Sequence, residues 1–216
     1  MVFGKSSVAE PSFKVLYTHS MSFEYEIRKY GERYAAEATY KNGDDSPFGI
    51  LAKYIGVFGT PENEGNEAIS MTAPVVMQSK ATAIAMTAPV IQTEGQAGQK
   101  TMQFILPEEY DSLYKIPKPT NPGVVIKAIP AQTGAVHRFS GTHSEEGDRK
   151  IATEFAAQLQ KDGVDITVDY VLQNYQFWAF NPPFTIPMLR RNEIWVELST
   201  GQVETLLKGF SPQEAN

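Results

Sequence analysis

The feature that most constrains the fold is an order of strand-like and helix-like segments that occurs twice along the chain. In the first copy, alternating or β-prone residues predict strands at 24–30, 34–40, 68–77 and 100–106, with a helix at 47–58. After a Pro-rich connector at 116–123, the order returns with strands at 124–129, 135–140, 166–173 and 193–198 and a helix at 148–161. Consecutive antiparallel strands with two helices predict an α+β fold, in which an antiparallel sheet curls into a partial barrel with both helices against it.

The size of the chain fits one domain. With 216 residues, 42% of them hydrophobic, the chain can bury a single core. We expect one domain at 12–200, with halves at about 12–115 and 123–200, an N-terminal tail at 1–11 and a C-terminal tail at 201–216.

Composition removes several classes of function and site. The net charge of -6 gives no electrostatic case for nucleic acid or an anionic membrane surface. The absence of cysteine excludes disulfides, thiolate metal sites and cysteine nucleophiles, and it favours a reducing compartment. Because the sequence has no apolar run of signal-peptide or membrane-spanning length, we expect a cytoplasmic protein without membrane insertion, with a chloroplast location left open.

The sequence shows no recognisable catalytic constellation. His19, His137 and His143 are too scattered for a metal-ligand spacing, and there is neither a Gly-rich phosphate loop after a strand nor a G-x-S-x-G motif. His137 shares a strand face with Ala135 and Phe139, a position typical of a core or edge residue. We therefore expect a binding protein and not an enzyme.

The two predicted helices differ in their apolar patterns. The helix at 148–161 has one apolar stripe and one polar face, as an ordinary packing helix does. The core-facing stripe of the helix at 47–58 contains Phe48, Leu51, Ala52, Ile55 and Phe58, and its opposite arc contains Ile50, Tyr54 and Val57. Because monomers seldom expose large apolar patches, either a loop or a dimer partner covers this arc, or the arc faces a ligand.

A Pro-rich segment at 177–191 is the candidate cover. Its three prolines predict a loop with fixed turns, which carries several aromatic residues and ends in Arg190 and Arg191. Two interpretations stay open. The loop closes the end of the barrel and packs on itself, or it binds a flat, apolar, anionic ligand.

One strand-like phrase occurs twice in close succession. Residues 68–75, AISMTAPV, return as AIAMTAPV at 83–90. We interpret residues 67–92 as a local tandem duplication, and the hypothesis is that the two copies compete for one place in the sheet.

Six groups of residues, in this order, resemble the SOUL/heme-binding protein family. They are YEIRKY at 25–30, KYI at 53–55, ISMTAPV at 69–75, FILP at 104–107, RFSG at 138–141, and NPPF at 181–184 with RRNEIW at 190–195. The similarity covers about residues 12–198, and the first five residues look like the plant and algal branch. The resemblance implies a distorted antiparallel β-barrel from two pseudo-symmetric ββαββ halves with two flanking helices.

The resemblance also implies a function and a site. It implies a soluble protein that binds heme or another tetrapyrrole non-covalently, as a carrier or buffer, in a shallow apolar groove between the first helix and the Pro-rich loop. At the matching positions, the groove would use Ile50, Leu51, Lys53, Tyr54, Val57 and Phe58, with Phe184, Pro187 and Met188 across from them. Lys53 or Arg190 would pair with the propionates.

Iron ligation is not expected from these two elements. An axial histidine is proposed for some members of the family, but neither the first helix nor the Pro-rich loop contains a histidine. We therefore expect no metal site, with His137 as the candidate ligand if the iron is coordinated.

An alternative function is a small-molecule sensor or a protein-interaction module on the same barrel. The barrel resembles the effector domain of multidrug-responsive regulators, where a similar groove takes other flat hydrophobic ligands. Because no DNA-binding segment accompanies the barrel, a signal would pass to a protein partner. A protein partner in tetrapyrrole handling is also left open.

Overall fold

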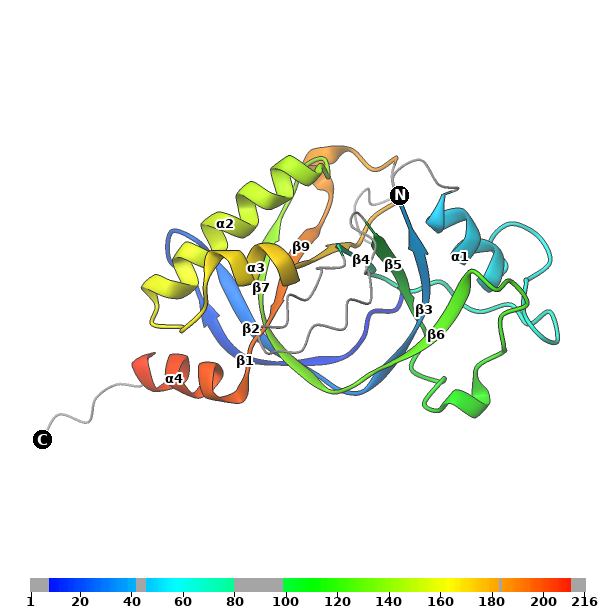
Figure 1. The fold of residues 1–216 in the computed structure, drawn as a ribbon, viewed down its shortest axis with the longest axis horizontal. Coiled ribbons are helices and arrows are strands. Elements are labelled where there is room, and N and C mark those ends of the chain that lie inside the picture. Colours follow the sequence, from blue (N-terminus) through cyan, green and yellow to red (C-terminus); the bar gives the residue numbers. More distant parts are fainter. Residues whose placement is uncertain (1–7, 42–45, 80–98, 183, 211–216) are drawn as a thin grey trace, which may run out of the picture.

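The computed structural model describes residues 8–41, 46–79, 99–182 and 184–210, and it has the expected α+β class (Figure 1). The nine strands within these ranges are β1 (Phe13–His19), β2 (Tyr25–Tyr30), β3 (Arg33–Tyr40), β4 (Val75–Ser79), β5 (Lys100–Ile105), β6 (Val124–Ile129), β7 (Gln132–Phe139), β8 (Gln176–Ala179) and β9 (Asn192–Glu197). The helices are α1 (Pro47–Ile55), α2 (Glu145–Lys161), α3 (Val168–Asn174) and α4 (Thr200–Phe210), with short 3₁₀ turns η1 (Leu113–Lys115) and η2 (Pro187–Leu189).

All nine strands form one curled antiparallel sheet in the order β1-β2-β7-β9-β8-β4-β5-β3-β6. The order from β2 to β6 has an internal symmetry. If β2, β3, β4 and β5 are exchanged with β6, β7, β8 and β9, respectively, the same order results when it is read in reverse. The strand order is therefore the one that two ββαββ halves would produce, while a superposable pair of halves stays a prediction.

The strands separate an outer face, which packs on the helices, from an inner face. Tyr25 and Ile27 of β2 pack with Phe155 of α2, and this part of the core also includes residues of α3 and α4. The inner face carries a separate cluster, which contains Tyr30, Ala35, Val76, Ile105, Val136, Trp178 and Trp195. Figure 1 shows α2 and α3 beside one part of the sheet and α1 beside the other. Because successive side chains of a strand point to opposite faces, this alternation determines which residues lie on the inner face of the curled sheet.

The first helix is shorter than the sequence pattern predicts. The Ser46 side chain caps its start by accepting a hydrogen bond from the Gly49 amide at 3.4 Å. Gly56 ends it in the left-handed conformation, with φ of 88°. Val57 and Phe58 therefore lie beyond the helix, and the prediction of a helix to residue 58 is wrong.

Four further segments differ from the predictions. The strand expected at 166–173 is instead α3, whose start is capped by the Thr167 side chain, and Val171 packs into the core next to α2. The start of the expected C-terminal tail is instead α4, with Val203 and Leu206 buried. The strand expected at 68–77 covers only 75–79, and the first residues of the expected Pro-rich loop form β8.

The first copy of the duplicated phrase is anchored in the fold. Thr72 forms an isolated bridge with Ala9, and its hydroxyl donates to the carbonyl of Ile105. The second copy, at 83–90, lies outside the described residues. None of the helices in the described ranges is both long enough and apolar enough to cross a membrane.

Candidate functional site

The α1 side of the expected groove is only partly accessible. Leu51 and Tyr54 are fully buried, and the Tyr54 hydroxyl donates to the Pro117 carbonyl at 2.8 Å. Burial raises the pKa of Tyr54, which keeps the phenol a hydrogen-bond donor. The expected outer arc therefore does not extend to Tyr54, because the Pro-rich connector covers that position.

The remaining α1 positions offer some surface. Lys53 is exposed on the helix, Ile50 is half-buried, and Val57 and Phe58 are exposed beyond the helix C-cap. A ligand at this side could touch these four side chains. Leu51 and Tyr54 could support them only from beneath.

The Pro-rich loop exposes large apolar side chains. Phe184 is 88% exposed and Met188 is 77% exposed, and Ile186 and Leu189 also face solvent. Pro187 is exposed as well, and Arg190 is half-buried. The loop does not simply pack on itself, although its aromatic residues before Phe184 are buried.

Hydrogen bonds hold this loop in a defined shape. The Arg191 amide donates to the Asn181 side chain at 2.6 Å, and the Arg190 Nε donates to the Thr185 carbonyl at 2.8 Å. The Gly141 amide, just after β7, donates to the Pro187 carbonyl at 2.9 Å. The apolar surface is therefore preorganised, which lowers the entropic cost of binding a ligand.

A hollow of about 700 Å³ lies between this loop and strands β1, β2 and β7. It is lined by Thr18, His19, Ser20, Glu24, Tyr25, Glu26, Arg28, Val136, Arg138, Phe139, Ser140, Met188, Leu189 and Arg190. Met188 and Arg190 thus border it among the expected site residues, whereas its other walls are strands and not α1. We call it the β1–β2–β7 hollow.

A buried ion-pair network forms the floor beside this hollow. Glu193 of β9 is fully buried and accepts from Arg28 at 2.9 Å and from Arg191 at 2.8 Å. Arg28 also pairs with Glu26 at 2.6 Å, and Arg191 reaches Glu10 at 2.9 Å. Although burial opposes the charge of Arg28, the nearby Glu193 carboxylate raises its pKa. The carboxylates of Glu26 and Glu193 are thus both paired with the Arg28 guanidinium.

His137, the candidate iron ligand, packs on the outer face. Its ring stacks on Phe23 at 4.0 Å between centroids and lies 5.9 Å from the ring of Phe155. Its Nδ1 is 2.7 Å from the Glu24 carbonyl, and burial lowers its pKa. His137 does not line the β1–β2–β7 hollow, and no group of three or more His, Cys, Asp or Glu that could hold a metal ion occurs in the described part of the chain.

Sequence reasoning missed the strand side of this hollow. His19 lines it from the end of β1 and stacks on Tyr25 at 4.9 Å, and Arg138 lines it from β7. The alternation of β2 and β7 could have placed Glu26, Arg28 and Arg138 on one face, but nothing in the sequence pattern brings the Pro-rich loop to them.

Comparison with known proteins decides the family. Residues 8–197 match the family described as SOUL heme-binding protein, which is most of the chain. The chain belongs to the SOUL family. The resemblance that the sequence phrases indicate is therefore confirmed.

Solved structures share the fold of this SOUL protein at low sequence identity. The C-terminal domain of EcmrR superposes with a TM-score of 0.52 at 12% identity, covering 83% of this chain and 99% of that domain. EcmrR in a complex with DNA gives a TM-score of 0.50 at 13% identity, covering 82% of this chain and 57% of that one. No curated protein sequence matches the chain. At such identities the likeness concerns the fold alone.

Proposed function

We propose that this SOUL protein binds heme or another tetrapyrrole non-covalently and reversibly, as a carrier or buffer without a catalytic step. The observation that carries the proposal is the Pro-rich loop, which presents Phe184, Met188 and their apolar neighbours to solvent on a backbone fixed by hydrogen bonds. A flat macrocycle gains from such a surface, because it buries apolar area without ordering a mobile segment. The family description supports the ligand class.

The residues present suit a tetrapyrrole held mainly by its face. Burying about 400 Å² of apolar surface is worth about 10 kcal/mol at 25 cal/mol/Å². Association costs at least ~4 kcal/mol, so the remaining ~6 kcal/mol corresponds to a dissociation constant in the tens of micromolar. Such weak binding suits a reversible carrier or buffer.

The ligand is proposed to bind without an axial histidine. The exposed residues of α1 and of the Pro-rich loop include no histidine, and His137 is held against Phe23. His19, which lines the β1–β2–β7 hollow, is buried with its ring stacked on Tyr25. Metal-free porphyrin is therefore expected to bind nearly as well as heme. The α1 wall of the groove stays a prediction.

The proposal is tested by titrating the protein into hemin and, in parallel, protoporphyrin IX. Soret absorbance and protein fluorescence report binding, and we expect saturable binding of both ligands with dissociation constants in the tens of micromolar. Met188→Ser combined with Phe184→Ser should weaken both by at least tenfold, since each exposed side chain loses part of its contact area. Tyr114→Ser is the matched control, because Tyr114 is fully exposed on η1, far from the loop in the sequence.

The outcomes separate the functions. If neither ligand shows saturable binding, the result contradicts tetrapyrrole binding. It then favours the alternative function, a sensor or protein-interaction module on the same barrel. Saturation with hemin alone contradicts face-dominated binding and returns a histidine ligand to consideration.

A further inference from the structure

We infer that the tetrapyrrole lies in the β1–β2–β7 hollow, with its carboxylates on Arg138 and Arg190 and its ring against Met188 and Leu189. This inference rests on the proposed function and names its site, which differs from a groove against α1. Three independent features carry it. They are the size of the hollow, its charge and the fixed position of the loop that walls it.

The size of the hollow suits a macrocycle. Its volume of about 700 Å³ falls within the ~300–1,000 Å³ that pockets for ligands of this size occupy. Two other hollows, of about 250 Å³ and 60 Å³, are too small for a porphyrin.

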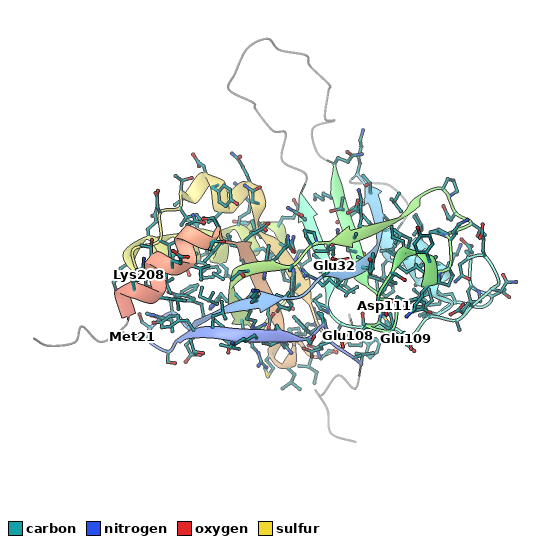
Figure 2. The ribbon with its side chains drawn as sticks, turned by 90° about the horizontal axis from the view of Figure 1, so that it is seen from below. Met21, Glu32, Glu108, Glu109, Asp111 and Lys208 are labelled. Atoms are coloured by element: carbon teal, nitrogen blue, oxygen red, sulfur yellow. The ribbon has the colours of Figure 1, made fainter. Side chains whose placement is uncertain are left out.

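A hollow of about 410 Å³ beside Tyr34 and Tyr110 has the wrong charge. Glu32, Glu108 and Asp111 line it, and Figure 2 shows these acids together with Glu109 near the N-terminal end of β1. They repel an anionic ligand. The β1–β2–β7 hollow includes the opposite end of β1, next to Met21 in Figure 2.

The charge of the β1–β2–β7 hollow favours an anion. Three arginines and two glutamates line it, and Arg28 is held by Glu26 and by the buried Glu193. The charge offered to a ligand therefore comes from Arg138 and Arg190, with Glu24 opposing them. Glu26 is already paired with Arg28 at 2.6 Å, so it offers little repulsion. The Arg138 guanidinium is exposed and has no ion pair or hydrogen bond with any described residue. It can therefore donate hydrogen bonds to a ligand carboxylate without breaking a contact.

The loop brings the second arginine and the apolar wall to the same place. The Gly141 amide holds the Pro187 carbonyl at 2.9 Å, and Asn192 donates to the Gly141 carbonyl at 3.1 Å. These bonds tie the loop to the end of β7, three residues after Arg138. Met188 and Leu189 then form an exposed apolar edge beside two guanidinium groups. A porphyrin, whose two propionates leave one edge of an apolar ring, has the matching pattern.

The test measures hemin and protoporphyrin IX binding to the full chain with single charge reversals. Arg138→Glu should raise both dissociation constants about tenfold, because it removes one ion pair and adds a repulsion. Lys115→Glu on η1 is the control, because it changes the net charge equally and should leave both constants unchanged. Lys53→Glu on α1 tests the alternative groove. Arg138→Lys should retain most of the affinity. The urea midpoint of each variant checks that the fold is intact.

A second ligand reports on the carboxylates directly. Protoporphyrin IX dimethyl ester should bind the wild type more weakly than protoporphyrin IX does, and Arg138→Glu should not weaken it further. If Arg138→Glu leaves the porphyrin constants unchanged, or if Lys53→Glu raises them as much, the assignment to this hollow is overturned while tetrapyrrole binding stands. If the wild type binds no porphyrin, the proposed function fails together with its site.

Discussion

Gly134 in β7 allows Trp195 to pack closely against this strand, because glycine has no side chain. A Cβ at this position would lie 2.5 Å from Cε2 of Trp195 and 2.6 Å from the Val196 carbonyl oxygen. Without it, the Trp195 ring lies close over β7 and stacks on Trp178, with 6.0 Å between centroids and 8° between planes. The two tryptophans form the centre of the inner face.

Replacing Gly134 by alanine should therefore destabilise the protein. We expect Gly134→Ala to lower the free energy of unfolding by about 1–3 kcal/mol, because the tryptophan or the β9 backbone must shift. Urea unfolding followed by tryptophan fluorescence measures the change. Gly31→Ala is the control, since a Cβ there meets nothing within 4 Å. Equal effects of the two changes would contradict the steric explanation.

His137 gives the stability a dependence on pH. Burial lowers its pKa in the folded state and outweighs the opposite effects of the Glu24 carbonyl and the Glu154 carboxylate. Because the unfolded chain then binds the proton more readily, the stabilising contribution is present above the unfolded pKa of about 6.5 and is lost as pH falls.

His137→Gln, which can still donate to the Glu24 carbonyl, should reduce this dependence. The wild type is expected to lose more of its free energy of unfolding between pH 7.5 and pH 5.5 than the variant does. Urea unfolding at the two pH values measures both losses. A variant that loses as much as the wild type would show that other groups cause the dependence.

At the scale of elements, α3 and α4 show how packing overrides local sequence patterns. Residues 166–173 include valine and isoleucine and read as a strand, yet the Thr167 cap and the burial of Val171 make 168–174 a helix. The segment after β9 reads as a tail, yet Val203 and Leu206 of α4 join the core around Phe155. Helix α4 is therefore part of the folded unit.

Truncating the buried residue of α4 tests its contribution. Leu206 is fully buried, so Leu206→Ala should lower the free energy of unfolding by about 2–5 kcal/mol. Glu204→Ala, an exposed change in the same helix, should alter it by less than about 0.5 kcal/mol. Chemical unfolding gives both values. A loss for Leu206→Ala no larger than that for Glu204→Ala would mean that α4 does not contribute to the cooperative core.

At the scale of the whole molecule, the sheet order leaves β1 and β6 at its two ends. Each pairs with one neighbour among the described strands, whereas β7, β8 and β9 pair on both sides. Amides of edge strands open to solvent more readily than those of central strands. The curl of the sheet therefore predicts a gradient of protection across the molecule.

Hydrogen exchange should detect this gradient. We expect the amides of β9 to exchange slowest, and the amides of β6 that do not face β3 to exchange fastest among the strands. Exchange followed by NMR or by mass spectrometry of peptides measures the rates. Protection of β6 equal to that of β9 would mean that β6 finds a second partner and that the sheet closes in solution.

Local periodicity was sufficient for much of the fold. Local alternation and helical spacing predict the strands at 25–30, 33–40, 100–105, 124–129 and 192–197, the presence of helices α1 and α2, and the α+β class, because these patterns reflect which face of an element is buried. The family followed from short phrases in order. The sequence also marked the Pro-rich loop as a separate, aromatic and cationic segment.

Contacts between distant segments decided the rest. Tyr54 is buried because the connector at Pro117 covers it, and α3 is a helix because it packs beside α2. The β1–β2–β7 hollow forms because Gly141 and Asn192 tie the Pro-rich loop to the end of β7. Periodicity describes which side of an element turns inward, but the partner that meets that side can come from any part of the chain. Only the tertiary structure therefore determined which surfaces remain available to a ligand.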